Sequence, residues 1–230
     1  MENKVVLHIC GLEIGHKGRR LYKSINLDVR EGECIMLCGA NGSGKTTLLK
    51  AISCMNGRGS SEVVMIPARI PKVKGFTLKE FIRLSCFRQS DAGGRLAPED
   101  EATMLRAMSD LGLESHAAQD ISTLSDGEFQ KAGIAAALVR KAAVIMLDEP
   151  TAFLDAENRA AVLKTLKELT RTGSRPAVIF STHDLYDGTA AADRVIALGA
   201  DGEVHVSDES KDSKESAVRT IFSSTRNLTL

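Results

Sequence analysis

The chain has 230 residues, of which 43% are hydrophobic, and Lys+Arg 30 balances Asp+Glu 30. This length accommodates one large α/β domain or two small ones, and the apolar content supports a sizeable core. The zero net charge, the absence of Trp and an aromatic content of 4% give no electrostatic or stacking basis for nucleic acid as a main partner. No apolar run approaches the roughly 20 residues of a membrane span, and the N-terminus has no signal-peptide pattern. We therefore expect a cytosolic protein, which can still dock on a membrane partner.

The first part of the chain, residues 4–38, is rich in predicted β-structure. Short apolar runs at 5–9, 24–29 and 34–37 are separated by turns rich in Gly and Arg, a pattern typical of strands. A helix is predicted over 47–52, directly after a glycine-rich segment.

The cysteines lie among apolar neighbours, and none belongs to a C-x-x-C pair. They are Cys10, Cys34, Cys38, Cys54 and Cys86. Cys34 and Cys38 share one face of a predicted strand and are too far apart along it to form a disulfide. We expect reduced thiols in the core rather than a metal or redox site.

Two amphipathic helices are predicted in the middle of the chain, over 77–87 and 98–112, with a loop at 89–94 between them. In the second helix, Pro98 occupies the first turn and the acidic residues after it suit the positive end of the helix dipole. The apolar stripe of this helix consists of Met104, Leu105, Met108 and Leu111.

The rest of the chain alternates between helix and strand. Helices are predicted over 128–140 and 156–170, strands over 143–147, 177–180 and 194–198, and a hairpin turn at Asp201-Gly202. Continuous apolar strands that alternate with helices are typical of a mainly parallel sheet covered on both faces, an α/β fold. The tail, approximately 207–230, begins with a segment rich in Ser, Asp, Glu and Lys, and we expect it to be solvated.

A phosphate site is indicated by a run that matches G-x-x-x-x-G-K-[ST] at every fixed position. The run consists of Gly39, Ala40, Asn41, Gly42, Ser43, Gly44, Lys45 and Thr46, with Thr47 next to it. A strand before the run and a helix after it are the context in which this pattern binds a nucleoside triphosphate, rather than being a chance glycine-rich turn. We expect Lys45 to reach the β- and γ-phosphates and the Thr46 hydroxyl to ligate Mg²⁺.

Two carboxylates end the apolar strand at 143–147. In phosphoryl-transfer ATPases a carboxylate at a strand end holds Mg²⁺, and an acidic neighbour can act as general base toward water. Asp148 fits the first role and Glu149 the second. The alternative is a solvated turn at the end of the strand, which the glycine-rich run disfavours.

The residues at the start of the helix predicted over 128–140 also have two interpretations. Ser125 and Glu128 have the S-x-x-E spacing of a capping box, which predicts a well-capped helix. The Ser125 hydroxyl, the Gly127 amide and the helix N-terminus together can also bind an anion.

The order of these motifs resembles that of the ATP-binding-cassette ATPases, with a P-loop NTPase core, an N-terminal antiparallel β subdomain and a small helical subdomain at about 70–120. Residues 124–130 (LSDGEFQ) resemble the family's signature, 152–155 its D-loop and 181–184 its switch-histidine loop. The chain is identified as a single domain of this family over 1–230, an ATPase that binds ATP and Mg²⁺.

The resemblance implies a pair of cassettes, a homodimer in the simplest case, with each ATP held between the P-loop of one chain and the signature of the other. Ser125, Gly127 and Glu128 then contribute to the partner's nucleotide site, and Asp155 communicates across the interface. His183 is implied to contact the γ-phosphate in its own chain, as a catalytic residue beside Glu149 and Lys45.

Two positions depart from the family pattern. The aromatic residue that usually stacks on adenine is replaced by His16, whose imidazole can stack less strongly or belong to an ordinary loop. The glutamine that usually precedes the helical subdomain aligns with Ala68, which can neither ligate Mg²⁺ nor orient water. Either a neighbour compensates or coupling differs in this chain.

The signature and D-loop residues are similar to those of cassettes that power uptake of iron–siderophore, haem or cobalamin complexes. The resemblance implies an importer subunit that lies on the inner face of the cell membrane through an integral membrane permease. The helical subdomain would dock there, and Phe76, Leu78, Phe81 and Ile82 serve either that contact or a core. The alternative is a soluble non-transport cassette, such as one serving iron–sulfur-cluster assembly.

Overall fold

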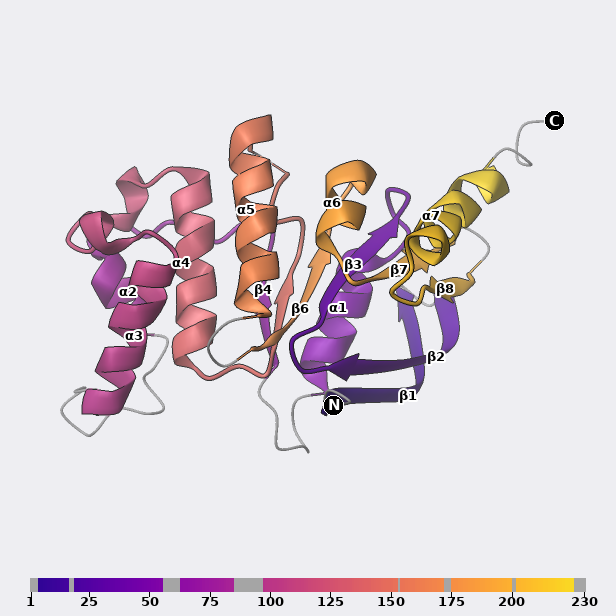
Figure 1. The fold of residues 1–230 in the computed structure, drawn as a ribbon, viewed down its shortest axis with the longest axis horizontal. Helices are drawn as coiled ribbons and strands as arrows, with labels where there is room; N and C mark the ends of the chain where they lie inside the picture. The colour runs from indigo at the N-terminus through magenta and orange to yellow at the C-terminus, as the bar shows by residue number, and fades with distance from the viewer. Residues whose placement is uncertain are drawn as a thin grey trace.

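A six-stranded sheet runs through the middle of the computed structural model, in the order β4-β5-β6-β3-β7-β8 (Figure 1). The structure describes residues 4–16, 19–55, 63–84, 97–152, 154–171, 175–199 and 202–225. The strands of this sheet are β3 (Cys34–Gly39), β4 (Val63–Ile66), β5 (Val144–Leu147), β6 (Ala177–Ser181), β7 (Arg194–Leu198) and β8 (Val204–Val206). All neighbours pair in parallel except β7 and β8, which form the predicted hairpin. The mainly parallel α/β sheet is therefore confirmed.

Apolar layers cover both faces of this sheet. Along β3, Cys34, Met36 and Cys38 belong to one buried cluster, whereas Ile35 and Leu37 belong to a second cluster on the opposite face. The first cluster includes residues of α4 (Asp126–Val139), α5 (Ala156–Leu169) and α7 (Lys211–Thr225). The second includes α1 (Lys45–Cys54). Burial on both faces explains why these strands are continuous apolar runs in the sequence.

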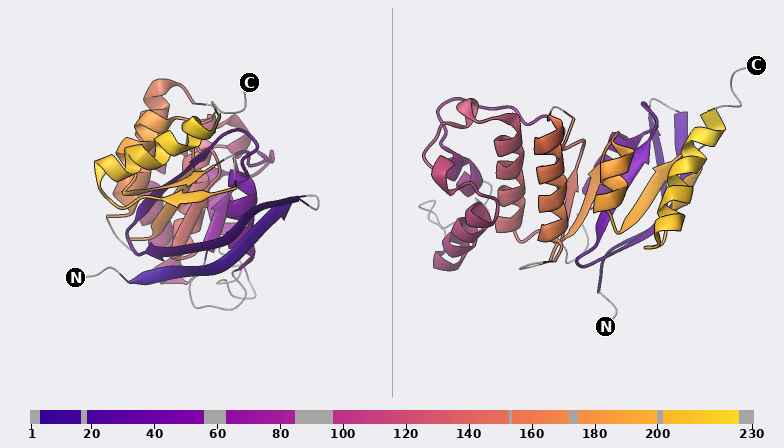
Figure 2. Two further views of the ribbon diagram at one scale, coloured as in Figure 1. Left: turned by 90° about the vertical axis from the view of Figure 1, so that its right-hand side faces the viewer. Right: turned by 45° about the horizontal axis from the view of Figure 1, so that its top comes forward.

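A separate two-stranded antiparallel sheet is formed by β1 (Val5–His16) and β2 (Arg19–Arg30). Both strands are longer than the apolar runs at 5–9 and 24–29, because the pairing continues through polar residues. Buried residues of both strands join the cluster around α1. The side view in Figure 2 shows this sheet beside the main one, as expected for the N-terminal antiparallel β subdomain.

A group of helices lies at the β4 end of the molecule (Figure 1). It contains α2 (Leu78–Leu84), α3 (Pro98–Asp110) and two short 3₁₀ helices (Glu114–His116 and Ile121–Thr123), and α4 packs against both α2 and α3. Leu78 and Ile82 are fully buried, so they serve the core rather than a docking surface. The predicted apolar stripe of α3 is wrong at Leu105, which is 51% exposed and therefore lies on the outer face of the helix.

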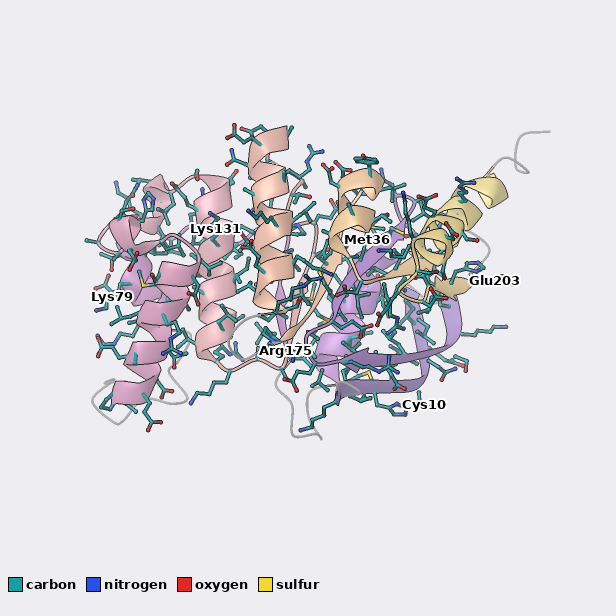
Figure 3. The ribbon with its side chains drawn as sticks, in the orientation of Figure 1. Cys10, Met36, Lys79, Lys131, Arg175 and Glu203 are labelled. Carbon is teal, nitrogen blue, oxygen red and sulfur yellow. The ribbon has the colours of Figure 1, made fainter. Side chains whose placement is uncertain are left out.

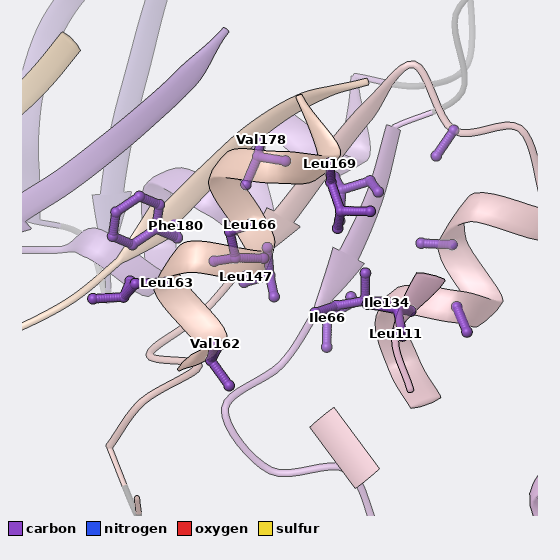
Figure 4. Close-up of a cluster of buried hydrophobic side chains, with 14 of the residues drawn as sticks. Ile66, Leu111, Ile134, Leu147, Val162, Leu163, Leu166, Leu169, Val178 and Phe180 are labelled. Atoms are coloured by element: carbon purple, nitrogen blue, oxygen red, sulfur yellow. The ribbon is translucent and has the colours of Figure 1, made fainter. Parts of the chain in front are cut away.

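The packing of α5 on the sheet illustrates how the helices are held (Figure 4). Val162, Leu163, Leu166 and Leu169 lie along one side of the helix at helical spacing and are buried in the same cluster as Phe180. Burying a side chain of this size contributes about 2 kcal/mol. This face therefore holds α5, and the loop before it, in place.

The expectation of a solvated tail from residue 207 holds only in part for its described residues, since residues 208–216 are exposed or partly exposed but others are buried. Residues 211–225 form α7, in which Ala217 and Ile221 are buried in the main cluster. Ser207 is also buried, and its Oγ accepts a hydrogen bond of 2.8 Å from the Val195 amide. The apolar positions lie four residues apart on one face, and the polar residues around them masked this pattern in the composition.

The cysteine expectation holds only in part. Cys34 and Cys38 are buried free thiols, and burial raises the pKa of each to about 12. Cys10 and Cys54 are exposed instead, because Cys10 lies on the outer side of β1 and Cys54 ends α1. Cys86 and the predicted loop 89–94 lie outside the described residues.

Among the helices of the described segments, none combines the length and the apolar character needed to cross a membrane.

Candidate nucleotide site

The P-loop residues, Asp148, Glu149 and His183 meet at the carboxyl ends of three adjacent strands. β3 lies between β6 and β7, and β5 is the next strand beyond β6. The glycine-rich run follows β3, Asp148 and Glu149 follow β5, and His183 follows β6. In parallel α/β sheets this edge is where ligands bind.

The glycine-rich run, residues 39–46, forms the loop between β3 and α1 and is called the P-loop below. Gly42 and Gly44 have φ angles of 76° and 99°, which residues with a side chain rarely adopt. A Cβ at Gly39 would lie 2.5 Å from the Ser43 Oγ, so only glycine fits this position. The loop therefore turns its backbone toward the start of α1, where N–H groups and the helix dipole favour an anion.

Lys45, the first residue of α1, is buried at the mouth of the P-loop. Its Nζ donates hydrogen bonds to the carbonyl oxygens of Gly39 (2.9 Å) and Ala40 (3.3 Å). Burial lowers the pKa of the ammonium group, while the nearby carboxylate of Glu149 acts in the opposite direction. The group is thus a buried cation placed where phosphates are expected, next to the proposed base.

Thr46, Asp148 and Ser181 form a connected polar group beside the P-loop. The Thr46 Oγ1 donates to one oxygen of the buried Asp148 carboxylate at 2.8 Å, and the Ser181 Oγ donates to the other at 2.9 Å. Hydroxyl and carboxylate oxygens suit Mg²⁺, which usually takes one or two protein ligands and completes its shell with waters and phosphates. These two expected ligands are therefore within reach of one ion.

Glu149 and His183 lie against each other above this group. The His183 Nε2 is 2.6 Å from the Glu149 Oε1, and both side chains are partly exposed. Glu149 has a positive φ of 49°, a strained conformation for a residue with a side chain. The Glu149 amide donates to the Ser181 Oγ at 2.8 Å, and this bond helps to hold the strained turn.

Ser181 was not identified as a functional residue from the sequence. It connects the Asp148 carboxylate with the backbone of Glu149, since its hydroxyl donates to Asp148 and accepts from the Glu149 amide. The signal in the sequence is a hydroxyl residue at the end of an apolar strand, directly before Thr182-His183.

Tyr22 on β2 is a second residue that sequence reasoning missed. Its buried hydroxyl lies 2.7 Å from the Ser43 carbonyl oxygen and 3.0 Å from that of Gly199. This side chain links the small sheet to the P-loop and to the end of β7.

The loop that carries His183 is held by the start of α6 (Leu185–Ala191). The Asp184 carboxylate caps this helix by accepting from the Asp187 amide, and it also accepts from the Arg159 Nη1 at 2.6 Å. The hydrogen bond from Arg159 is the largest of the contributions that lower the pKa of Asp184. The helix lies close to β3, and the glycine at position 188 allows this approach, because a Cβ there would lie 2.5 Å from the Met36 Sδ. Figure 3 labels Met36 beside α6.

The capping box at the start of α4 is confirmed. The Glu128 amide donates to the Ser125 Oγ at 3.2 Å, and the Ser125 amide donates to the Glu128 carboxylate at 2.7 Å. The hydrogen bond from Ser125 lowers the pKa of Glu128, to which His116 at 3.4 Å adds a smaller effect. The first turn of α4 is therefore rigid whether or not an anion binds to it.

The D-loop residue Asp155 lies near this helix start. It caps α5 by accepting a hydrogen bond of 2.8 Å from the Asn158 amide. Ser125, Gly127, Glu128 and Asp155 all line one cavity of about 410 Å³. The structure thus brings the four expected dimer-contact residues together, whereas Phe153 of the D-loop lies outside the described residues.

The two positions that depart from the family pattern, Ala68 and His16, have different outcomes. Ala68 lies in the loop after β4 and lines a second cavity together with Glu149, which agrees with a position near the chemistry. His16 is the last residue of β1, and its side chain lies outside the described part of the chain. A contact between His16 and adenine stays a prediction.

Comparison with known proteins identifies the family. Residues 22–152 match the family model described as ABC transporter. The hemin import ATP-binding protein of Streptomyces coelicolor is 34% identical over 207 residues, which cover 82% of this chain and 72% of that protein. The iron(3+)-hydroxamate import ATP-binding protein of Bacillus subtilis is 28% identical, with 81% of this chain and 76% of that protein covered. A cobalamin import ATP-binding protein of Halobacterium salinarum is 28% identical, with 87% of this chain but only 54% of that protein covered.

Solved structures agree on the fold. A nucleotide-free ATP-binding cassette from an ABC transporter superposes with a TM-score of 0.78 at 15% identity, covering 98% of each chain. A proposed metal-chelate type ABC transporter in an inward-facing conformation gives a TM-score of 0.83 at 21% identity, covering 96% of this chain and 90% of that one. The P-loop, the carboxylate pair and the fold lead to one conclusion: the chain belongs to the ABC transporter family, as an ATP-binding domain that hydrolyses ATP.

Proposed function

We propose that this ATPase powers the import of a metal chelate, such as haem, a cobalamin or an iron–hydroxamate complex. Relatives that cover most of this chain are named as import proteins for each of these compounds. Relatives named as aliphatic sulfonate importers are also 34% identical, so sulfonates are the competing cargo class. The observation that carries the ATPase mechanism is the Glu149–His183 pair beside the Asp148–Thr46 contact.

In this mechanism the P-loop binds the triphosphate of ATP, and Lys45 neutralises charge on the β- and γ-phosphates. The Thr46 hydroxyl and the Asp148 carboxylate would hold Mg²⁺, with Ser181 orienting the carboxylate through its other oxygen. When bound, Mg²⁺ supplies positive charge that offsets the charge developing on the phosphates. Removal of Mg²⁺ with a chelator is expected to abolish hydrolysis, and the Thr46→Val variant to require more Mg²⁺ for half-maximal activity.

Glu149 is the general base. Its carboxylate accepts a proton from the attacking water, and the His183 Nε2 at 2.6 Å keeps the carboxylate oriented and can turn to the γ-phosphate. A positioned base of this kind contributes about 10²–10⁴-fold to a rate. Both side chains are partly exposed, which leaves room for water to reach them.

A second copy of the chain completes each nucleotide site. The rigid first turn of α4 carries Ser125 and Gly127, and Asp155 lies on the same cavity. Since this cavity combines a helix N-terminus with a hydroxyl group, it suits a γ-phosphate presented by a partner. Glu128 contributes by fixing Ser125 through the capping box.

The transport role requires an integral membrane permease, and we place the ATPase on the cytoplasmic face of the membrane through that partner. The helical region α2–α3 is the proposed contact. Leu78 and Ile82 are buried, but Phe76 and Leu84 are exposed at 38% and 54% and are available to a partner. A soluble non-transport cassette is the alternative, and the importer relatives disfavour it.

Purification of the tagged chain from membranes separates these possibilities. Co-purification of a polytopic membrane protein supports transport, whereas co-purification with a soluble scaffold alone contradicts it. The isolated complex is then assayed for ATP hydrolysis after addition of haem, cobalamin, an iron–hydroxamate or a sulfonate with its cognate binding protein. Stimulation by a sulfonate but by none of the chelates would overturn the proposed cargo class.

A further inference from the structure

A cavity of about 320 Å³, lined by both polar and apolar side chains, lies between α4 and the loop that follows β4. Its lining includes Ala68 from that loop, Gln130 from α4 and Glu149 from the end of β5. Figure 1 shows α4 beside α5 and close to the β4 edge of the sheet. The cavity therefore connects the interior of the α4 region with the proposed general base.

Gln130 is the unusual member of this lining. The residue is only 8% exposed, and its Nε2 is a buried donor without a hydrogen-bond partner among the described residues. Buried amides in proteins are almost always paired, so each exception calls for an explanation. Gln130 lines the cavity, and because the last torsion of a glutamine side chain has a broad range, its amide can present a donor to water held there.

The backbone under Gln130 is held firmly. Gly133, one turn further along α4, faces the same loop, and a Cβ there would lie 3.0 Å from the Ile70 Cδ1 and 3.4 Å from the Ile66 Cγ2. Residues three apart lie on the same side of a helix. The close approach at Gly133 therefore holds α4, and Gln130 with it, against the segment that carries Ala68.

Two other charged groups of the lining already satisfy each other. The Lys72 Nζ donates to the Asp126 Oδ1 and to the Leu124 carbonyl oxygen, both at 2.7 Å. These bonds hold Lys72 at the α4 end of the cavity. Gln130 is thus an uncommitted amide on a cavity wall that also contains Glu149.

The cavity is large enough to hold water, and the polar side chains of its lining, Gln130 and Glu149 among them, supply hydrogen-bond partners. At roughly 30 Å³ of liquid volume per molecule, it accommodates several waters, and each requires two to four polar partners. The contact with His183 uses the Oε1 of Glu149, and a donor at the Oε2 would fix the carboxylate plane. Water that bridges Gln130 and Glu149 supplies this donor.

We propose that Gln130 is a positioning residue for ATP hydrolysis, which orients the Glu149 carboxylate through water held in the cavity beside Ala68. The inference rests on the proposed role of Glu149 as general base. The orienting amide is then that of Gln130 on α4, whereas Ala68, in the loop on the other side of the cavity, has only a methyl group.

Steady-state ATP hydrolysis by the full chain tests the proposal. Gln130→Met keeps the length of the side chain but removes the amide, and we expect kcat to fall about tenfold, as for a misoriented catalytic group, with the KM for ATP nearly unchanged. Ala68→Leu fills the cavity from the other wall and leaves α4 intact. It should lower kcat in the same way, which keeps the test valid if Gln130→Met folds poorly.

A rescue experiment distinguishes positioning from packing. Ala68→Gln introduces an amide on the opposite wall and should restore most of the kcat lost in Gln130→Met, while raising the wild-type kcat much less. Ala160→Gln, on the exposed side of α5, is the matched control and should rescue nothing.

Unchanged kcat in both Gln130→Met and Ala68→Leu would overturn the role of Gln130. An equal effect of Ala68→Gln in both backgrounds would also overturn it, because the two sites would then be uncoupled. If Glu149→Gln retained hydrolysis, the proposed base itself would fail, a result that is separate from the coupling between Gln130 and Ala68.

Discussion

The His183 Nε2 lies 2.6 Å from the Glu149 Oε1, although the two residues follow different strands. The parallel register explains this contact: Leu147, the last residue of β5, is opposite Phe180 of β6, so Asp148 follows β5 at the level of Ser181, where β6 ends. The backbone then leaves the sheet in a strained turn at Glu149, with φ 49°, which directs its side chain toward His183. The sheet thus places a carboxylate and an imidazole at one point.

Replacing the proposed base gives the first prediction. Glu149→Gln keeps the size of the side chain but cannot accept a proton, so ATP turnover should fall by about 10³-fold while ATP binding persists. Because ATP then stays intact between two chains, the variant should elute as a dimer from a sizing column when ATP and Mg²⁺ are present. Wild-type protein without nucleotide is the control. Near-normal hydrolysis by Glu149→Gln would remove Glu149 as the base.

Ser181 gives the second prediction. Ser181→Ala leaves the Asp148 Oδ1 and the Glu149 amide without their partner, and the loss of such buried bonds costs about 1–3 kcal/mol. We expect a lower free energy of unfolding in urea and a kcat reduced about tenfold. Ser53→Ala, which removes an exposed hydroxyl at the end of α1, is the control. Full activity of Ser181→Ala would show that Asp148 and Glu149 are oriented without it.

How much the sequence predicts depends on the range of the interactions. The P-loop, the capping box of Ser125 and Glu128, and the strand before Asp148 are local patterns, and the structure confirms each of them. The contact between Thr46 and Asp148 joins distant segments, but its place follows from the predicted parallel sheet, because both residues come directly after predicted strands whose carboxyl ends share one edge.

Features that depend on particular side-chain packing were not predicted. Tyr22 reaches the P-loop from a strand of the other sheet, and no local pattern marks such a residue. The buried face of α7 was hidden by the polar residues around Ala217 and Ile221. Exposure of Cys10 and of Leu105 depends on which side of an element faces a neighbour, and an apolar neighbourhood in the sequence does not determine this.

Tyr22 provides the third prediction. Tyr22→Phe removes only the hydroxyl that contacts the carbonyl oxygens of Ser43 and Gly199. Since the P-loop loses one support, the KM for ATP should rise several-fold, equivalent to about 1 kcal/mol, with a smaller change in kcat. Nucleotide binding by isothermal titration calorimetry measures the effect directly. An unchanged affinity would mean that the glycine backbone holds the loop without this bond.

The last prediction concerns pH and the loop that carries His183. The pKa of Asp184 is lowered from its ordinary value of 3.8, chiefly by the hydrogen bond from Arg159. A carboxyl group whose pKa is lower in the folded state stabilises the fold above its unfolded pKa and loses this contribution as the pH falls through its folded pKa. Asp184→Asn should therefore have a lower Tm than the wild type at pH 7, and the difference should shrink as the pH falls below about 4.

Arg159→Gln, which removes the partner rather than the carboxylate, should show the same convergence with the wild type at acidic pH. Lys164→Gln, whose Nζ lies 3.8 Å from an exposed Glu168 carboxylate on the same helix, is the control and should have a nearly wild-type Tm at every pH, because exposed pairs contribute little. A difference in Tm that persists unchanged to low pH would assign the effect of Asp184 to helix capping and packing rather than to its charge. In that case the switch loop would be held by the shape of the α6 start, independently of Arg159.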